Sequence, residues 1–157
     1  MLMQFQEYLT FENIYLWTNF GILPFWALLI LMPGSKFTHF FLNSVILPLI
    51  LSSVYIYIIY QSILLDDSLL GFFEIYLSLD NLYTLFSSES FLVAFWLHFL
   101  ALNIFLGSWI SKDSVKYAIP RKFIFVPLIL VYFSGPFGLV IYWLIRLFYA
   151  KRLSFHD

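Results

Sequence analysis

Four long runs of apolar residues alternate with short polar segments along the chain. The runs cover residues 14–32, 40–65, 91–110 and 123–149. A helix rises about 1.5 Å per residue, so about 20 residues cross the hydrocarbon core of a bilayer. Each run has about this length or more, and only the last contains a Lys, Arg, Asp or Glu, namely Arg146 near its end. The pattern predicts an all-α integral membrane protein, a four-helix bundle with these runs as its spans.

The segment between the second and third runs, residues 66–89, has a different composition. It mixes acidic residues with leucine, phenylalanine and tyrosine and contains no basic residue. Its acids are Asp66, Asp67, Glu74, Asp80 and Glu89. The segment is too polar to cross a membrane and too apolar for a solvated loop, so it predicts a short interfacial helical segment between spans two and three. Asp80 is predicted to cap a helical turn over 81–86.

Prolines divide the four predicted spans into two kinds. Pro24, Pro48 and Pro127 lie inside three of them, and the run Gly-Pro-Phe-Gly at 135–138 should kink or unwind the fourth. The third span contains no proline. We therefore expect a straight third helix with three bent helices around it.

The composition supports the membrane prediction and excludes several functions. Hydrophobic residues make up 62% of the 157 residues and charged residues 11%, whereas soluble domains carry about 25% charged residues. The absence of cysteine excludes disulfides, iron–sulfur clusters, thiolate zinc sites and cysteine nucleophiles. A net charge of −1 gives no indication of a nucleic-acid partner. The length predicts a single membrane domain over residues 1–157.

The basic residues predict an orientation. Four spans would place both termini on one side of the membrane, together with Arg146, Lys151 and Arg152. The two short loops on the other side carry Lys36, Lys112, Lys116, Arg121 and Lys122. The excess of basic residues favours a cytoplasmic position for the short loops. The N-terminal segment lacks Lys and Arg, which is untypical of secretory and transit peptides, so the chain is expected to be complete from Met1.

Two polar residues lie deep in the third span and are candidates for a functional site. Polar groups at this depth are costly unless they have partners. His98 is either a general acid/base, or a metal or haem ligand, or a packed histidine bonded to a backbone carbonyl. Asn103 is either a hydrogen-bond donor to a ligand or a contact between helices. Five residues turn a helix by about 140°, so the two side chains should not line one groove.

Further candidates lie at the ends of the third span. Glu89, Ser87 and Ser88 are either a site for the polar end of a ligand or the cap of the span. Asp113 is either an anchor or proton donor for a ligand, or a surface ion pair with its neighbouring lysines.

Aromatic residues are the third group of candidates. The chain contains 20 Phe, 11 Tyr and 5 Trp, which suits a flat, conjugated, apolar ligand such as a carotenoid or quinone, or a surface that faces lipid. Tyr57 and Tyr60 share a helix face in the second span, and Trp96 shares a face with Asn103. A haem between His39 and His98 is disfavoured because the two lie at different depths. No sequence motif of a soluble enzyme is present, and no metal site is expected.

Short motifs along most of the chain resemble those of the abscisic-acid-deficient-four-like family, the neoxanthin-synthesis membrane proteins of plants with relatives in algae and bacteria. The matching pieces are Leu23-Pro24-Phe25-Trp26 with Pro33, the tyrosine-bearing 50–60, Leu85-Phe86-Ser87-Ser88-Glu89, Trp96-Leu97-His98, Gly107-Ser108-Trp109-Ile110 with Asp113, Ile119-Pro120, Pro127, and Gly135-Pro136-Phe137-Gly138-Leu139. Their order and spacing make the resemblance specific. One departure is Asn103, where the family typically has an aspartate.

The resemblance implies a role in converting violaxanthin to neoxanthin, an intramolecular isomerisation of an epoxide to an allene. Such a reaction needs an acid and a base but no redox cofactor. The side chain of Asn103 is an amide and acts neither as an acid nor as a base. The implied catalytic residues are therefore His98, Glu89 and Asp113. The predicted ligand-binding residues are Trp96, Asn103, Ser87, Ser88, Tyr57 and Tyr60.

The sequence is compatible with two functions. The first is a multi-pass protein of a bacterial inner membrane or a thylakoid that acts on, or binds, a carotenoid or another isoprenoid. The second is a non-catalytic subunit or assembly factor, in a homo-oligomer or a larger pigment-binding membrane complex. A transporter is disfavoured because the predicted spans contain neither an embedded carboxylate nor an internal repeat. A cavity that reaches His98 would favour the enzyme.

Overall fold

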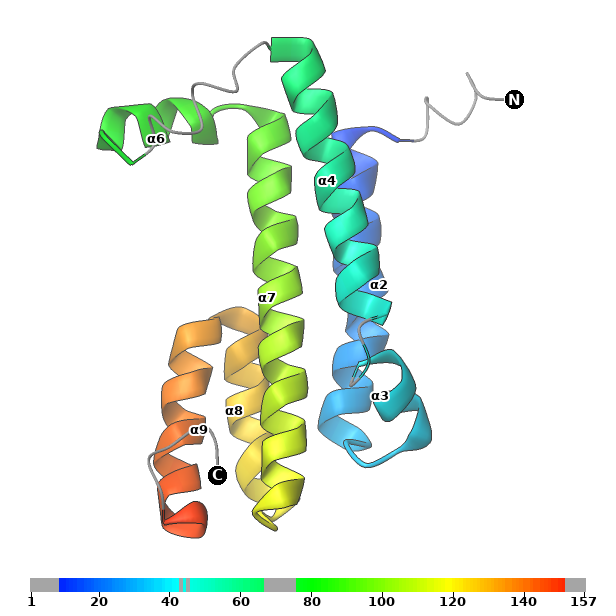
Figure 1. The fold of residues 1–157 in the computed structure, drawn as a ribbon, viewed down its shortest axis with the longest axis vertical. Coiled ribbons are helices and arrows are strands. Elements are labelled where there is room, and N and C mark those ends of the chain that lie inside the picture. The colour runs from blue at the N-terminus through cyan, green and yellow to red at the C-terminus, as the bar shows by residue number, and fades with distance from the viewer. Residues whose placement is uncertain (1–8, 43, 45, 67–75, 152–157) are drawn as a thin grey trace. The chain divides into compact units, whose positions relative to one another are not determined.

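The computed structural model describes residues 9–42, 44, 46–66 and 76–151, and every regular element within these ranges is a helix (Figure 1). The helices are α2 (Phe11–Leu31), α3 (Lys36–Phe41), α4 (Ile46–Asp66), α6 (Leu79–Phe86), α7 (Glu89–Lys116), α8 (Arg121–Phe133) and α9 (Gly135–Ala150). The prediction of an all-α protein is confirmed for this part of the chain. By length and composition, α2 and α7 are able to cross a membrane, while the apolar helices 46–62 and 135–150 are shorter.

The chain forms two compact units. The first comprises residues 1–21 and 49–99, and the second comprises residues 22–48 and 100–157. Helices α2, α4 and α7 each contribute residues to both units.

In the first unit, the start of α2, most of α4 and the start of α7 pack through apolar side chains. The buried residues include Ile14 of α2, Ile58 of α4 and Leu97 of α7. Ser62 and Ser90 add a buried hydroxyl–hydroxyl hydrogen bond of 3.1 Å between α4 and α7. The burial of apolar area is the main stabilising term here, because few polar groups are available.

Helix α6 follows the prediction of a short helix before the third span. Its residue Phe86 packs on the start of α7, with its ring centroid 5.3 Å from that of Phe91. Ser78 caps α6, since its hydroxyl accepts from the Asp80 N–H at 3.1 Å. The predicted cap, Asp80, lies in the first turn instead, so that prediction is wrong. Residues 67–75 of the predicted interfacial segment lie outside the described residues.

The predicted second span begins later than expected. Residues 36–41 form the separate helix α3, capped by Ser35, and α4 starts only at Ile46. Pro48 therefore lies in the first turn of α4 and not near the middle of a span. A proline is tolerated there because its missing N–H has no helical partner in any case.

The predicted fourth span is two helices in the structure. Helix α8 ends at Phe133, α9 begins at Gly135, and the two pack against each other. The ring centroids of Phe123 and Tyr149 lie 6.0 Å apart, so the start of α8 meets the end of α9. The prediction of one kinked span over 123–149 is wrong, because the chain reverses at Ser134 and forms an antiparallel hairpin (Figure 1).

Gly138 permits the close packing of this hairpin. A Cβ atom at this position would overlap the backbone of Val131, which cannot move aside as a flexible side chain can. The hairpin therefore depends on the missing side chain.

We expect Gly138→Ala to lower the free energy of unfolding by about 1–3 kcal/mol, the usual cost of overpacking. Thermal unfolding in detergent, followed by circular dichroism, measures the change. Gly21→Ala is the matched control, because a Cβ atom there meets nothing within 4 Å. Equal unfolding temperatures for the two variants would contradict the tight packing at Gly138.

Candidate functional site

A groove of about 410 Å³ lies between α2 and α7 in the first unit. It is lined by Glu12, Tyr15, Glu89, Leu92, Val93 and Trp96. We call it the α2–α7 groove. Its volume lies within the range of about 300–1,000 Å³ that is typical of ligand sites. The groove brings together two of the predicted site residues, Glu89 and Trp96.

The indole of Trp96 forms an aromatic wall of the α2–α7 groove. Its Nε1 donates a hydrogen bond of 2.8 Å to Asn19 Oδ1, and its ring lies 5.9 Å from that of Tyr15. On the same helix it stacks on Phe99, with ring centroids 5.2 Å apart. These contacts hold the indole in one orientation, so the wall is formed before any ligand binds.

Two carboxylates belong to the same groove. Glu12 lies in the first turn of α2, and Glu89 is the first residue of α7. Both side chains are exposed, and both lie at helix N-termini, where negative charge is stabilised. In a pair of carboxyl groups beside an apolar cavity, one group can act as the general acid and the other as the general base. Glu12 was missed from the sequence, because its proximity to Glu89 depends on how α2 packs on α7.

A second groove, of about 400 Å³, lies between α2 and α4. Its lining residues are Leu9, Ile14, Trp17, Thr18, Ser53, Val54 and Tyr57. Tyr57 was predicted as a ligand-binding residue, and its hydroxyl accepts a hydrogen bond of 3.2 Å from Gln61 Nε2. The other predicted tyrosine, Tyr60, is exposed and does not belong to either groove.

The remaining candidates of the first unit lie outside both grooves. The side chain of His98 is exposed and lies beside Tyr55 of α4, with ring centroids 6.2 Å apart. The hydroxyl of Ser87 donates to the Tyr83 carbonyl at 3.0 Å, and that of Ser88 bonds to the Ser90 hydroxyl at 3.0 Å. The two hydroxyls thus hold the junction of α6 and α7. Within the described residues, no three His, Asp or Glu side chains gather as metal ligands.

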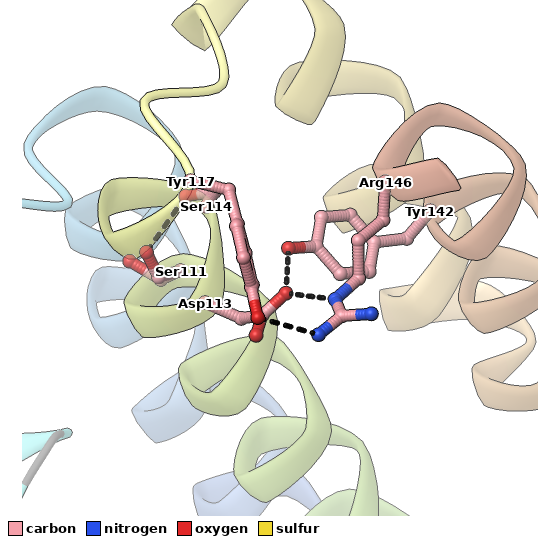
Figure 2. Close-up of polar contacts among 6 residues, drawn as sticks. All are labelled: Ser111, Asp113, Ser114, Tyr117, Tyr142 and Arg146. Atoms are coloured by element: carbon pink, nitrogen blue, oxygen red, sulfur yellow. Dashed lines mark hydrogen bonds and ion pairs between the residues drawn. The ribbon is translucent and has the colours of Figure 1, made fainter. Parts of the chain in front are cut away.

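A buried polar cluster lies in the second unit, between the end of α7 and α9 (Figure 2). The Tyr142 hydroxyl donates to Asp113 Oδ2 at 2.6 Å, and Arg146 Nε donates to the same oxygen at 2.7 Å. Arg146 Nη2 donates to the Tyr117 hydroxyl at 3.2 Å, and its guanidinium lies 4.8 Å from the ring of Trp143. Arg146 is 0% exposed and Asp113 is 8% exposed.

This cluster changes the interpretation of Asp113. The sequence suggested a surface ion pair with neighbouring lysines, whereas the structure gives a buried ion pair with Arg146 on another helix. The two close donors on one oxygen form charge-assisted hydrogen bonds that hold the Asp113 carboxylate in place. One signal was present in the sequence: Tyr142 and Arg146 are four residues apart in the last apolar run, so they share a helix face.

Asn103 is also buried in the second unit, with 5% of its surface exposed. Its Oδ1 lies against Gly135 at the start of α9, where a Cβ atom would overlap it. Its Nδ2 has no hydrogen-bond partner within the described part of the chain. The position of Oδ1 against Gly135 agrees with a contact between α7 and α9. Ligand binding through Nδ2 stays a prediction.

The model of the family described as ABA DEFICIENT 4-like matches residues 13–142. The chain belongs to this family. It is 26% identical over 104 residues to Protein ABA DEFICIENT 4, chloroplastic, from Arabidopsis thaliana. The matched region covers 65% of this chain and 47% of the plant protein, so the chain spans about half the length of this relative. No solved structure matches the chain.

The ABA DEFICIENT 4-like match includes parts of both candidate sites. Tyr15, Glu89 and Trp96 of the α2–α7 groove lie within it, as does Asp113 of the buried cluster. Glu12 lies one residue before the matched range, and Arg146 lies four residues after it.

We expect Arg146→Met to lower the free energy of unfolding by about 3–5 kcal/mol, because it leaves the Asp113 carboxylate buried without its counter-ion. Asp113→Leu combined with Arg146→Met should recover much of this loss, since neither charge then remains. Thermal unfolding in detergent measures both variants. The exposed Arg121→Met is the matched control and should change stability by less than about 0.5 kcal/mol. A double variant as unstable as the single one would refute this account of the ion pair.

Proposed function

We propose that this member of the ABA DEFICIENT 4-like family is a multi-pass membrane protein that acts on a carotenoid or a related isoprenoid. The proposed reaction is the intramolecular isomerisation of an epoxide to an allene. The proposal is supported by the family membership, by the two helices of membrane-spanning length and by the α2–α7 groove. The host membrane is proposed to be a bacterial inner membrane or a thylakoid.

The observation that carries the proposal is the combination of aromatic wall and carboxylates in the α2–α7 groove. Tyr15 and Trp96 offer flat apolar surfaces to a ring-bearing end group, and Glu12 and Glu89 offer the proton chemistry. A groove of about 410 Å³ suits one end of a carotenoid rather than the whole molecule. The rest of a long polyene would then run along the lipid-facing surface.

The two glutamates can supply both proton transfers of the isomerisation. In this scheme, one glutamate acts as the general acid and gives a proton to the epoxide oxygen as a carbon–oxygen bond breaks. The other glutamate, as a carboxylate, takes the proton from the chain carbon next to the carbon whose bond to oxygen breaks. The electron pair of that carbon–hydrogen bond forms the second double bond of the allene. One proton is given and one is taken, so no oxidant, reductant or cofactor enters the balance. Glu89 is proposed as one member of the pair and Glu12 as the other.

His98 is the alternative acid/base in the proposal. Its imidazole is exposed beside Tyr55, so a ligand bound on the outer surface of the first unit could reach it. Asp113 is a less suitable catalyst, because its Oδ2 already accepts from both Tyr142 and Arg146.

The second candidate is a non-catalytic subunit of a homo-oligomer or a larger membrane complex. Exposed aromatic side chains favour it, among them Phe20 at 68%, Phe133 at 72% and Phe148 at 81% exposure. Such residues can contact a partner helix as readily as lipid.

The deciding experiment expresses the chain in membranes that contain an epoxy-carotenoid and separates the pigments by chromatography. We expect Glu89→Gln and Glu12→Gln each to lower conversion by about 100-fold or more, since a lost acid or base typically costs 10²–10⁴ in rate. Pigment that co-purifies with the protein should remain, because the aromatic wall is intact.

Asp80→Asn is the matched control, because it removes an exposed acid of α6 that does not line the groove. If His98→Ala alone lost conversion while both glutamine variants stayed active, His98 would be the acid/base of the reaction. Bound pigment without conversion by the native chain would favour the non-catalytic subunit.

A further inference from the structure

Three helix ends meet at one end of the second unit. The turn after α7 is closed by a hydrogen bond of 2.9 Å from the Ile119 N–H to the Ser114 carbonyl, with Ala118 in the left-handed region at φ 52°. This turn sends the chain directly into α8. The hairpin then returns the end of α9 to the start of α8, as the 6.0 Å between Phe123 and Tyr149 shows. The ion pair of Asp113 with Arg146 ties α9 to the last turns of α7.

These helix ends carry most of the positive charge of the protein. The exposed basic residues here are Lys112, Lys116, Arg121, Lys122 and Lys151, which we call the basic rim. Arg146 lies buried beneath it. Asp113 is the only acidic residue in the described part of the second unit. Counted over the described residues alone, six basic residues against one acidic residue give this end a net charge of +5.

Aromatic side chains lie directly beside the basic rim. Phe123 is 40% exposed, Phe148 81% and Tyr149 38%. The ammonium of Lys116 lies 5.5 Å from the Tyr117 ring centroid, and that of Lys122 lies 5.1 Å from that of Phe123. Basic and aromatic side chains side by side at the end of an apolar helix are typical of the headgroup level of a membrane.

We propose that the basic rim binds the headgroups of anionic phospholipids. The charge supplies the attraction to phosphate, and the exposed aromatic residues select a lipid surface over a soluble anion or an acidic protein. Clusters of four to eight Lys and Arg beside a membrane helix bind anionic lipids in this way. The rim then faces the cytoplasm or its organellar equivalent.

The proposal also revises the orientation expected from four spans. That prediction placed Arg146 and Lys151 on the opposite side of the membrane from Lys112 and Arg121. The hairpin of α8 and α9 brings all four to one end of the second unit. Six of the eight Lys and Arg residues of the chain thus lie at this end of the second unit. This inference does not depend on the proposed reaction.

The test uses the full chain in mixed micelles of a neutral detergent with phosphatidylglycerol or with phosphatidylcholine of the same acyl chains. Native mass spectrometry counts the lipids that stay bound. We expect phosphatidylglycerol to be retained at least about tenfold better, because each cation near a charged surface favours binding by about fivefold. Raising the salt from about 0.1 to 1 M should remove most of this preference, since the screening length falls from about 10 to 3 Å.

Lys112→Gln, Lys116→Gln, Arg121→Gln, Lys122→Gln and Lys151→Gln combined should abolish the preference. Their side chains are exposed, so the fold should remain, which circular dichroism checks. A second variant with all four lysines of the rim changed to arginine keeps the charge and should keep the preference. Lys36→Gln, an exposed lysine of α3 outside the rim, is the matched control and should also keep it.

Three outcomes would overturn the proposal. The first is equal retention of the two lipids by the native chain. The second is an unchanged preference in the neutral five-residue variant, which would place the lipid site elsewhere. The third is full competition by soluble glycerol phosphate at the concentration of the lipid, which would indicate a site for small anions rather than a lipid surface.

Discussion

The buried ion pair between Asp113 and Arg146 constrains the whole C-terminal part of this protein. A guanidinium that is 0% exposed needs a counter-ion, because an isolated buried charge costs several kcal/mol. The partner lies near the end of α7, so α9 must return to that level after α8 has left it. The hairpin of α8 and α9 allows this pairing, and it also brings basic residues of α7, α8 and α9 to one end of the second unit.

The two candidate sites use polar residues in opposite ways. In the buried cluster, the Asp113 carboxylate is bound by Tyr142 and Arg146, which stabilises the fold and leaves little capacity for proton transfer. In the α2–α7 groove, Glu12 and Glu89 are exposed at helix N-termini beside an aromatic wall. For this reason the groove, rather than the more conspicuous cluster, is the better place for the chemistry proposed for this member of the family.

Features of this protein that nearby residues determine are predictable from the sequence, whereas features that depend on distant residues are not. The bounds of α2 and the start of α7 at Glu89 were predicted to within a few residues, because apolar length and polar ends are local signals. The position of Pro48 was misjudged, since the apolar run continues from α3 into α4 and conceals the break between the two helices. The second carboxylate of the groove, Glu12, was missed because it lies 77 positions before Glu89 in the chain.

The sequence by itself determined the helical class, the apolar character and the family of this protein, because hydropathy, turn residues and motif spacing are all read along the chain. The tertiary structure decided the direction of α9, the partner of Asp113 and which glutamates share a groove. Ser134 alone does not distinguish a kink from a reversal. That choice is made by contacts such as the one between Asp113 and Arg146, which lie 33 residues apart in the chain and 2.7 Å apart in space.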